Sequence, residues 1–215
     1  MEWVKKYNKK HHSIIDWNFY DTNYALDTNI YISEPSSLRF KYRNYALLKQ
    51  ASVGGPIPEG IIETYVRYSS WTSGQPNYPF IFRNQASDGT VNINNTYIVY
   101  LWTSTPGVGY PFDKARFIVI VGGTTTIVEE KSISPALYPD TWYLLRVKFW
   151  VYQGVLMVAF EYWDDSQWVK LCADFSDPNN RWATSSVNRV GIGGLYPQSP
   201  YYTWVDNTRI FRRVS

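Results

Sequence analysis

Hydrophobic and polar residues alternate with a period of two along most of the chain. Successive side chains of an extended strand point to opposite faces, so this period predicts strands with one buried face. Turn-forming residues interrupt the alternation at short intervals, which is typical of sandwiches and barrels. No helical period in the sequence lasts longer than a turn or two. The predicted strands are Ser37–Tyr42, Ala46–Gln50, Gly60–Ser70, Tyr78–Asn84, Thr96–Thr103, Ala115–Val121, Thr124–Lys131, Trp142–Tyr152, Val155–Trp163, Gln167–Asp174, Val187–Leu195 and Tyr201–Arg212.

Two hairpins are predicted by residues that suit tight turns. Gly122–Gly123 separates one pair of alternating runs, and Gln153–Gly154 separates another. Tight hairpin turns need positive φ angles, which glycine adopts without steric cost. A glycine-rich run, Gly191-Ile192-Gly193-Gly194, lies inside an alternating segment. We interpret this run as a strand that another backbone approaches closely, and not as a phosphate-binding loop.

Residues 161–177, EYWDDSQWVKLCADFSD, concentrate carboxylates and raise the question of an active site, a metal site or a turn. Alternating runs flank Asp164-Asp165-Ser166 on both sides. Asp and Ser favour turns because their side chains bond nearby backbone amides. Since the other carboxylates are spread along the two strands, we predict a hairpin turn here and not a reactive cluster.

Composition supports an all-β fold in one domain. Aromatic residues make up 18% of the 215 residues, with 19 Tyr and 10 Trp. Together with Val, Ile and Thr, these residue types suit a pleated, half-buried surface. A sandwich of this length commonly remains undivided. We therefore predict a basic, flexible arm at residues 1–12 and a single β-sandwich domain at residues 13–215.

The net positive charge comes from that arm, and the remaining residues are neutral on balance. Four of the 21 lysines and arginines and one of the 18 acidic residues lie in residues 1–12, which accounts for the net charge of +3. A neutral body is poorly suited to tracking phosphates, so we do not expect nucleic acid as a partner. No apolar run approaches the length of about 20 residues needed for a membrane helix, so we expect no membrane insertion. Residues 1–20 also lack the apolar core of a signal peptide.

The order of several motifs resembles the concanavalin A-like lectin/glucanase superfamily, in particular its laminin-G-type jelly rolls. The likeness spans about residues 35–213. It implies an all-β fold, a two-sheet antiparallel β-sandwich of jelly-roll type, and it supports function only by analogy. The motifs are Glu59–Arg67, Phe80–Arg83, Asn95–Leu101, Thr141–Val147 with the Gln153–Gly154 turn, Arg189–Gly193 and Trp204–Ile210.

Catalysis is not expected from this set of residues. Glycanases of the superfamily place paired carboxylates on one strand, with the retaining pair about 5–5.5 Å apart. The chain has no E-x-D-x-x-E or E-x-D-x-E run, and Glu129-Glu130 would point to opposite faces of a strand. A pair from different strands, for example Glu63 with Glu161, stays open. A glycoside hydrolase or polysaccharide lyase is therefore the less favoured alternative.

Other catalytic groups are scarce. A nucleophilic triad needs a base, and the two histidines, His11 and His12, both lie in the predicted arm. Cys172 is the single cysteine, which excludes an intrachain disulfide. We interpret it as a structural thiol and not as a nucleophile.

Calcium is the one cofactor that the resemblance implies. Related sandwiches tie their first and last strands with calcium through an aspartate placed as Asp206 is in WVDNTRI. Asp16 or Asp21 from the N-terminal segment would join Asp206 as ligands. The alternative is an Asp–Asn turn without metal.

The strongest functional hypothesis is an aromatic binding surface. Aromatic side chains combine a large contact area with a polar tip, as glycan sites require. If Val66, Phe82, Val99 and Leu101 point to the core, the residues of opposite parity form an outer face. We predict that this face, with a tryptophan from a neighbouring loop, binds the ligand. The predicted site is Tyr65, Arg67, Arg83, Tyr100, Trp102 and Trp71.

These observations favour a non-catalytic carbohydrate-binding, lectin-like domain that acts in surface recognition or attachment. Its expected partner is a glycan or glycoprotein surface, in an extracellular or particle-surface setting. The alternative is a structural or interaction protein of a virion or cell-surface assembly, whose exposed aromatics form contacts in a homo-oligomer or between shell subunits.

Overall fold

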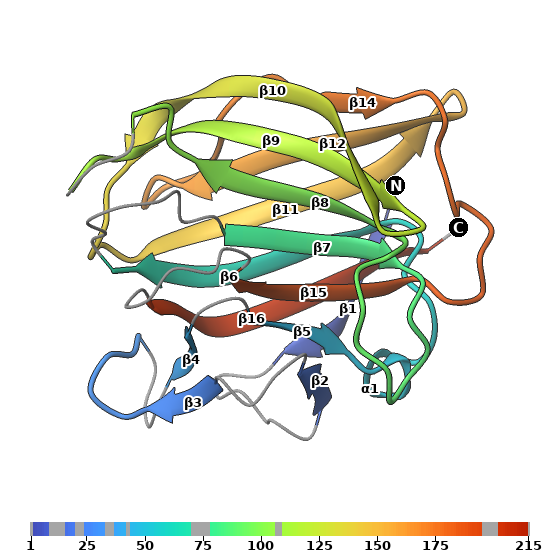
Figure 1. Cartoon of the computed structure of the whole chain (residues 1–215), viewed down its shortest axis with the longest axis horizontal. Coiled ribbons are helices and arrows are strands. Elements are labelled where there is room, and N and C mark those ends of the chain that lie inside the picture. The colour runs from blue at the N-terminus through green and yellow to red at the C-terminus, as the bar shows by residue number, and fades with distance from the viewer. Residues whose placement is uncertain are drawn as a thin grey trace.

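The structure, a computed structural model, consists of two antiparallel sheets packed face to face (Figure 1). It describes residues 2–8, 16–19, 24–32, 37–41, 44–69, 78–105, 109–194 and 202–214. The nine-stranded sheet has the order β13-β12-β11-β6-β16-β4-β3, with β1 paired to β16 and β14 paired to β12. The seven-stranded sheet has the order β10-β9-β8-β7-β15-β5-β2. The predicted all-β sandwich of jelly-roll type is therefore confirmed.

Most predicted strands are present with small shifts at their ends. The strands are β1 (Glu2–Asn8), β2 (Trp17–Phe19), β3 (Tyr24–Asp27), β4 (Ser37–Lys41), β5 (Asn44–Leu48), β6 (Gly60–Tyr68), β7 (Tyr78–Asn84), β8 (Thr96–Trp102), β9 (Phe112–Val121), β10 (Thr124–Leu137), β11 (Tyr143–Tyr152), β12 (Val155–Trp163), β13 (Trp168–Lys170), β14 (Phe175–Asp177), β15 (Arg189–Gly194) and β16 (Tyr202–Val214). The described part of the chain holds one helical turn, α1 (Gln50–Val53), which is too short to cross a membrane.

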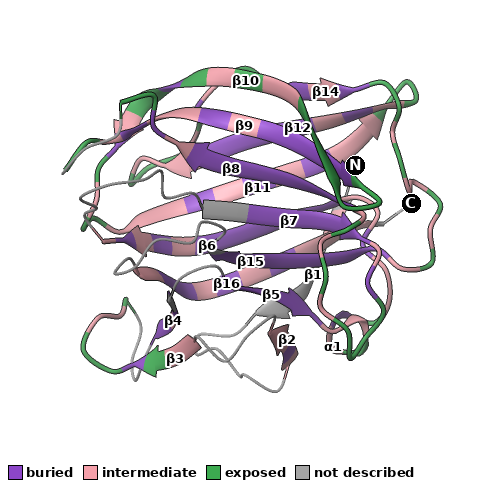
Figure 2. Ribbon diagram, viewed as in Figure 1, coloured by how far each residue is buried: buried purple, intermediate pink, exposed green. Residues whose placement is uncertain are grey.

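The hydrophobic core lies between the two sheets. Alternate residues of each strand enter it, as the period of two predicts. Phe82 of β7 stacks on Phe149 of β11 with ring centroids 4.7 Å apart, so the two sheets meet through aromatic rings. Figure 2 shows β8 and β15 buried along most of their length, whereas much of β10 is exposed. A second buried cluster, which includes Ile81, Ile98 and Tyr100, lies on the other face of the seven-stranded sheet.

The predicted turns are confirmed by their backbone angles. Gly122 and Gly123 have φ angles of 56° and 83°, and Gln153 and Gly154 have 50° and 81°. Asp165, in the carboxylate-rich segment, has a φ of 71°, and the Asp164 amide donates to the Gln167 carbonyl. The carboxylates of that segment therefore surround a hairpin turn, as predicted.

The glycines of β15 allow the close backbone contact that the sequence predicts. A Cβ atom on Gly193 would lie 2.4 Å from Tyr45 Cα, and one on Gly191 would lie 2.4 Å from the Ala46 carbonyl oxygen. Such contacts are shorter than van der Waals distances, so only glycine fits beside β5 at these positions.

Two segments differ from the sequence predictions. Glu2–Asn8, part of the predicted arm, forms strand β1 beside β16, while residues 9–12 lie outside the described residues. The predicted strand Gln167–Asp174 is a short strand, β13, followed by a bend. The division into an arm and one domain stays a prediction.

Candidate functional site

The predicted binding face is divided between the two sheets. Tyr65 and Arg67 lie on β6 of the nine-stranded sheet, whereas Tyr100 and Trp102 lie on β8 of the seven-stranded sheet. The expectation that they share one face is therefore wrong. The reason is physical: a period of two separates inward from outward residues but does not say which sheet a strand joins. Trp71 lies outside the described residues.

Arg83 is buried and does not belong to an outer face. Its relative exposure is 0%, and its φ of 48° lies in the left-handed region. The register of β7 against β15 shifts between Arg189 and Gly191, so β7 carries a bulge here. A bulge adds a residue to one strand and changes which face the following side chain takes. The prediction that Arg83 is exposed is therefore wrong.

The Arg83 guanidinium instead holds two loops together. Its Nε donates to the Pro58 carbonyl at 2.7 Å, and its Nη1 donates to Asn180 Oδ1 at 2.7 Å and to the Arg181 carbonyl at 3.0 Å. Burial lowers the pKa of Arg83, opposed by the nearby Tyr97 and acidic groups. This arginine is a buried structural cation in the described structure.

Tyr100 and Trp102 belong to a group of polar and aromatic side chains on the outer face of the seven-stranded sheet. Strand register places Tyr100 beside Arg116 and Trp102 beside Lys114, and Arg116 beside Glu130 of β10. The Arg116 guanidinium carbon lies 3.6 Å from the Trp102 ring centroid. Glu130 accepts from Arg116 Nε at 2.5 Å and from Lys114 Nζ at 2.9 Å. We call these five residues the Trp102 cluster.

The charges of the Trp102 cluster are fixed but accessible. Burial disfavours ionisation of Glu130, but the hydrogen bonds and charges of Lys114 and Arg116 outweigh it and hold the pKa of Glu130 below its ordinary value. For Arg116, burial is outweighed by its hydrogen bonds to Tyr100 and Glu130, which raise its pKa. The side chains of Lys114, Arg116 and Glu130 remain 30%, 23% and 28% exposed.

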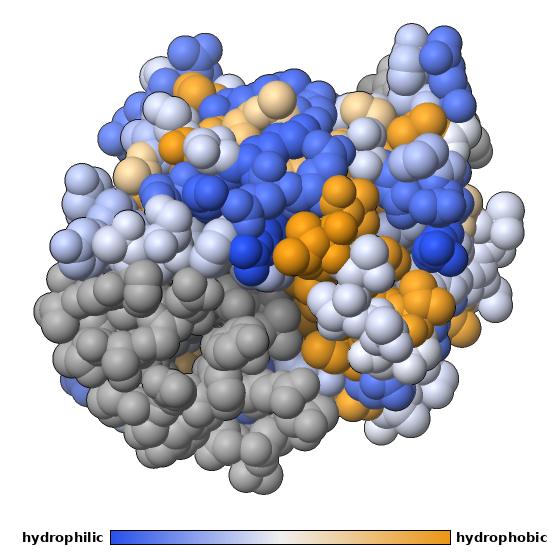
Figure 3. Space-filling view, turned by 45° about the horizontal axis from the view of Figure 1, so that its top comes forward, coloured by the Kyte–Doolittle hydropathy of each residue, from blue (hydrophilic) through white to orange (hydrophobic). Residues whose placement is uncertain are grey.

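One donor in the Trp102 cluster lacks an acceptor. Among the residues that the structure describes, the buried Trp102 Nε1–H finds no hydrogen-bond partner. An unsatisfied buried donor costs about 1–3 kcal/mol. Figure 3 shows hydrophilic and hydrophobic side chains in adjoining patches on the face of the molecule that it draws. The arrangement suits a ligand that offers both hydroxyl groups and apolar C–H surfaces.

Tyr65 and Arg67 face a different surface, on the nine-stranded sheet. Arg67 is 25% exposed, and its guanidinium carbon lies 5.6 Å from the centroid of the Trp204 ring. Asp140 accepts from Arg67 Nη2 at 3.5 Å. Cation–π contacts at exposed sites contribute about 0.5–1 kcal/mol, so this pair helps to order the surface.

Glu63 and Glu161, the carboxylates left open as a possible dyad, flank one arginine. Cross-strand pairing aligns Glu63 of β6, Arg146 of β11 and Glu161 of β12. Arg146 Nε donates to Glu161 at 2.6 Å, and Arg146 Nη1 lies 3.7 Å from Glu63. The two glutamates are two strand spacings apart, about 9.6 Å between Cα atoms. With Arg146 between them, the two glutamates form a row of ion pairs.

The predicted calcium ligands contact different parts of the fold. Asp206 is 0% exposed, and its two carboxylate oxygens accept the backbone amides of Ile32 at 2.9 Å and Asn207 at 2.7 Å. Asp16 accepts from the Ser52 hydroxyl at 3.0 Å. Across the described residues, no three acidic, histidine or cysteine side chains gather as metal ligands. Asp16 and Asp206 are thus engaged by protein donors, Asp21 lies outside the described residues, and calcium binding stays a prediction.

The remaining candidate nucleophile is protected. Cys172 is half-buried, and burial raises its pKa to about 11. A thiol with such a pKa is almost entirely protonated near neutral pH and is a poor nucleophile. His11 and His12 lie outside the described residues.

Comparison with known proteins identifies the fold. No protein-family model matches the chain, and no curated protein matches it by sequence. Among solved structures, the exoplasmic/lumenal domain of VIP36 with Ca²⁺ and Man3GlcNAc bound has a TM-score of 0.57 and 14% identity, covering 99% of this chain and 88% of that domain. Peanut lectin has a TM-score of 0.56 and 9% identity, with full coverage of both chains.

Two further matches come from different settings. The CBM2 module of an evolved Dit protein from Lactobacillus casei BL23 phage J-1 has a TM-score of 0.53 and 10% identity, covering 99% of this chain and 97% of the module. A GH43 glycoside hydrolase has a TM-score of 0.57 and 12% identity, but this chain spans only 40% of it. At these identities the matches identify the architecture and nothing more: the chain has the concanavalin A-like jelly-roll fold.

Proposed function

We propose that the protein is a non-catalytic carbohydrate-binding domain whose binding site is the Trp102 cluster. The observation that carries this proposal is the layered contact between Arg116 and Trp102, with Glu130 fixing the cation at 2.5 Å. This geometry presents guanidinium and ammonium donors, a carboxylate acceptor and aromatic surface on one sheet face. Sugars require that combination because each ring carries hydroxyl groups around an apolar C–H face.

The solved structures of the same fold support this assignment as analogy. The VIP36 domain was solved with Man3GlcNAc bound, and the phage Dit module is described as a CBM2 module. The fold also occurs in a glycoside hydrolase, so the fold alone does not separate binding from hydrolysis. The position of Arg146 between Glu63 and Glu161 favours the non-catalytic assignment. We place the domain in surface recognition or attachment, at an extracellular or particle surface.

Binding is tested with a glycan array, followed by titration calorimetry on the strongest glycan. Truncating a central aromatic anchor typically costs 2 kcal/mol or more, so Trp102→Ala is expected to weaken binding roughly thirtyfold. Trp150→Ala is the matched control, because Trp150 lies on β11 of the other sheet with Lys148 Nζ 5.2 Å from its ring centroid. Equal loss in both variants, or binding unchanged by Trp102→Ala in a folded protein, would contradict the assignment.

A second candidate function, a subunit of a larger assembly, is favoured by the edge strand β10. β10 ends the seven-stranded sheet, and Ile127 on it is 53% exposed. Exposed edge strands offer unpaired backbone groups to another chain. Light scattering coupled to gel filtration distinguishes the two functions. A stable oligomer that Ile127→Lys dissociates supports the assembly role, whereas a monomer that binds glycan supports the first proposal.

A further inference from the structure

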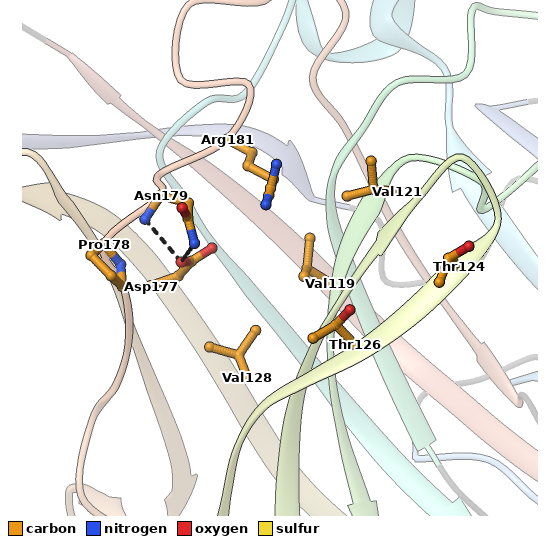
Figure 4. A pocket seen from close by; sticks show the side chains of 9 residues that line it. All are labelled: Val119, Val121, Thr124, Thr126, Val128, Asp177, Pro178, Asn179 and Arg181. Carbon is orange, nitrogen blue, oxygen red and sulfur yellow. Dashed lines mark hydrogen bonds between the residues drawn. The ribbon is translucent and has the colours of Figure 1, made fainter.

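A pocket opens at the end of the sandwich where β9 turns into β10, away from the Trp102 cluster. We call this end the mouth of the sandwich. The pocket has a volume of about 360 Å³ and lies between the β9–β10 hairpin and the segment after β14 (Figure 4). Val119, Val121 and Val128 supply its apolar wall, and Thr124 and Thr126 stand beside them. Ligand pockets range from about 300 to 1,000 Å³, so this one suits a ligand of roughly one sugar ring.

Arg181 enters this pocket from the opposite side. Figure 4 shows its side chain extending from the loop toward Val119. The residues on both sides of it have left-handed backbones, with φ angles of 42° at Asn180 and 57° at Trp182. Non-glycine residues in this region cost about 1 kcal/mol or more and persist where their surroundings fix them, often at ligand sites.

Two buried side chains fix the backbone of Arg181. The Tyr97 hydroxyl accepts the Arg181 amide at 3.0 Å, and Arg83 Nη1 donates to the Arg181 carbonyl at 3.0 Å. Tyr97 and Arg83 are both fully buried. The backbone of Arg181 is therefore held from two sides. Such preorganisation lowers the entropy lost when a ligand binds.

The other charged groups near the pocket compensate one another, which leaves the Arg181 guanidinium free to bind a ligand. Asp177 also lines the pocket, but it is 2% exposed, and it accepts from the Tyr97 hydroxyl at 2.6 Å and twice from Asn179 at 2.9 Å. The buried Arg83 cation compensates its charge. Within the described residues, the Arg181 guanidinium and the Thr124 and Thr126 hydroxyls make no hydrogen bond or ion pair. The free groups are thus one forked cation and two hydroxyls over an apolar wall.

We infer that this pocket binds a sugar unit that bears a carboxylate, of the uronate or sialate class. The planar guanidinium of Arg181 matches a carboxylate in a two-bond contact. The two threonine hydroxyls bond ring hydroxyls, and the valines pack on the C–H face or an acetyl methyl group. A fatty acid would leave the threonines unpaired, and inorganic phosphate would leave the valines uncovered, so neither fits as well.

The pocket is independent of the Trp102 cluster. Val119 and Val121 lie at the end of β9 that leads into the Gly122–Gly123 turn. Lys114 and Arg116 lie nearer the other end of β9 and face outward. Val121 lies five residue steps after Arg116 along the strand, a rise of about 16 Å. The two sites can therefore fail or succeed separately in experiments.

The test uses D-glucuronate and N-acetylneuraminate as probes, with glucose as the neutral sugar and inorganic phosphate as the bare anion. Amide chemical shifts in NMR spectra of the full chain report both affinity and location. We expect at least one acidic sugar to bind with a Kd of about 1 mM, as suits a ligand of this size. The shifts should centre on Val119, Thr124, Thr126 and Arg181, and glucose should bind at least tenfold more weakly.

Four variants make the outcome specific. Arg181→Gln is expected to weaken binding of the acidic sugar at least tenfold, and Thr126→Val is expected to weaken it less. Lys170→Gln is the charge-matched control, because Lys170 is exposed on β13 and pairs with Asp174 at 2.7 Å. Trp102→Ala should leave this site unchanged while weakening binding at the Trp102 cluster roughly thirtyfold.

Five results would overturn the inference, and the first four concern this pocket. The first is the absence of shifts with both acidic sugars at about 50 mM, which is far above the expected Kd. The second and third are glucose binding with equal affinity and phosphate binding as tightly as the acidic sugars. The fourth is full binding of an acidic sugar by a folded Arg181→Gln variant. An acidic sugar whose shifts fall on Tyr100 and Trp102 instead would assign it to the other site and equally overturn this one.

Discussion

Replacing Arg83 with methionine tests whether a buried cation holds the mouth of the sandwich together. Methionine keeps the length and apolar stem of the side chain but removes all three hydrogen bonds that the guanidinium donates. The Pro58 and Arg181 carbonyls and the Asn180 amide oxygen then lose their donor. Each buried acceptor left without a donor costs about 1–3 kcal/mol.

The structure favours the lower part of that range. Pro58 and Asn180 are only partly buried, and Arg181 is exposed, so water reaches the acceptors once the side chain is gone. Removing the desolvated charge also recovers some free energy, as replacements of buried ions show. At about 1 kcal/mol for each acceptor, Arg83→Met should lower the free energy of unfolding by about 3 kcal/mol. For a chain of this size, that corresponds to a fall in Tm of about 6–12 °C.

Urea unfolding followed by tryptophan fluorescence measures this change. Arg67→Met is the matched control, since Arg67 is partly exposed and its ion pair with Asp140 spans 3.5 Å. Exposed ion pairs contribute about 0–1 kcal/mol, so the control should stay within that range. A loss below about 1 kcal/mol for Arg83→Met, or equal losses in the two variants, would refute the assignment of a structural role to Arg83.

Four smaller predictions concern other residues of the structure. Because the pKa of Glu130 is lowered, its contribution to stability is present above pH 4.5 and is lost as the pH falls below that value, and Glu130→Gln should flatten this part of an acid unfolding curve. Cys172 should react with a thiol reagent at pH 8 far more slowly in the native protein than in urea, since burial raises its pKa to about 11. Gly193→Ala should cost about 1–3 kcal/mol in urea unfolding, because the new methyl would lie 2.4 Å from Tyr45 Cα. Excess chelator should leave the Tm unchanged, given that both carboxylate oxygens of Asp206 already accept amides, and a chelator-dependent fall would show instead that calcium is bound.

The period of two predicted the strands and their inward residues because burial of one sheet face depends only on alternation. The period does not show which strands pair. The sequence prediction therefore assigned Tyr65, Arg67, Tyr100 and Trp102 to one face, although their strands lie in different sheets. That choice depends on long-range pairing, which a single sequence does not encode locally.

Bulges account for the other differences at the candidate site. The bulge in β7 turned Arg83 from a predicted surface residue into a buried one. In the β9–β10 hairpin, counting from the Gly122–Gly123 turn would place Glu129 opposite Arg116. A register shift between Ile127 and Glu129 places Glu130 there instead, which completes the Trp102 cluster. The hairpin sequence thus indicates that Lys114 and Arg116 face an acidic residue of β10, but the bulge makes that residue Glu130 and not Glu129.

The pairing of β1 with β16 has a consequence for the order of folding and for redesign of the chain. Glu2 lies opposite Val214, so the nine-stranded sheet gains this strand only when segments about 200 residues apart meet. Closing so long a loop costs conformational entropy before any contact is made, and such topologies fold slowly. The same proximity means that a short linker could join Glu2 to Val214. New termini placed at the exposed Gly122–Gly123 turn would then convert the slowest long-range contact into a local one.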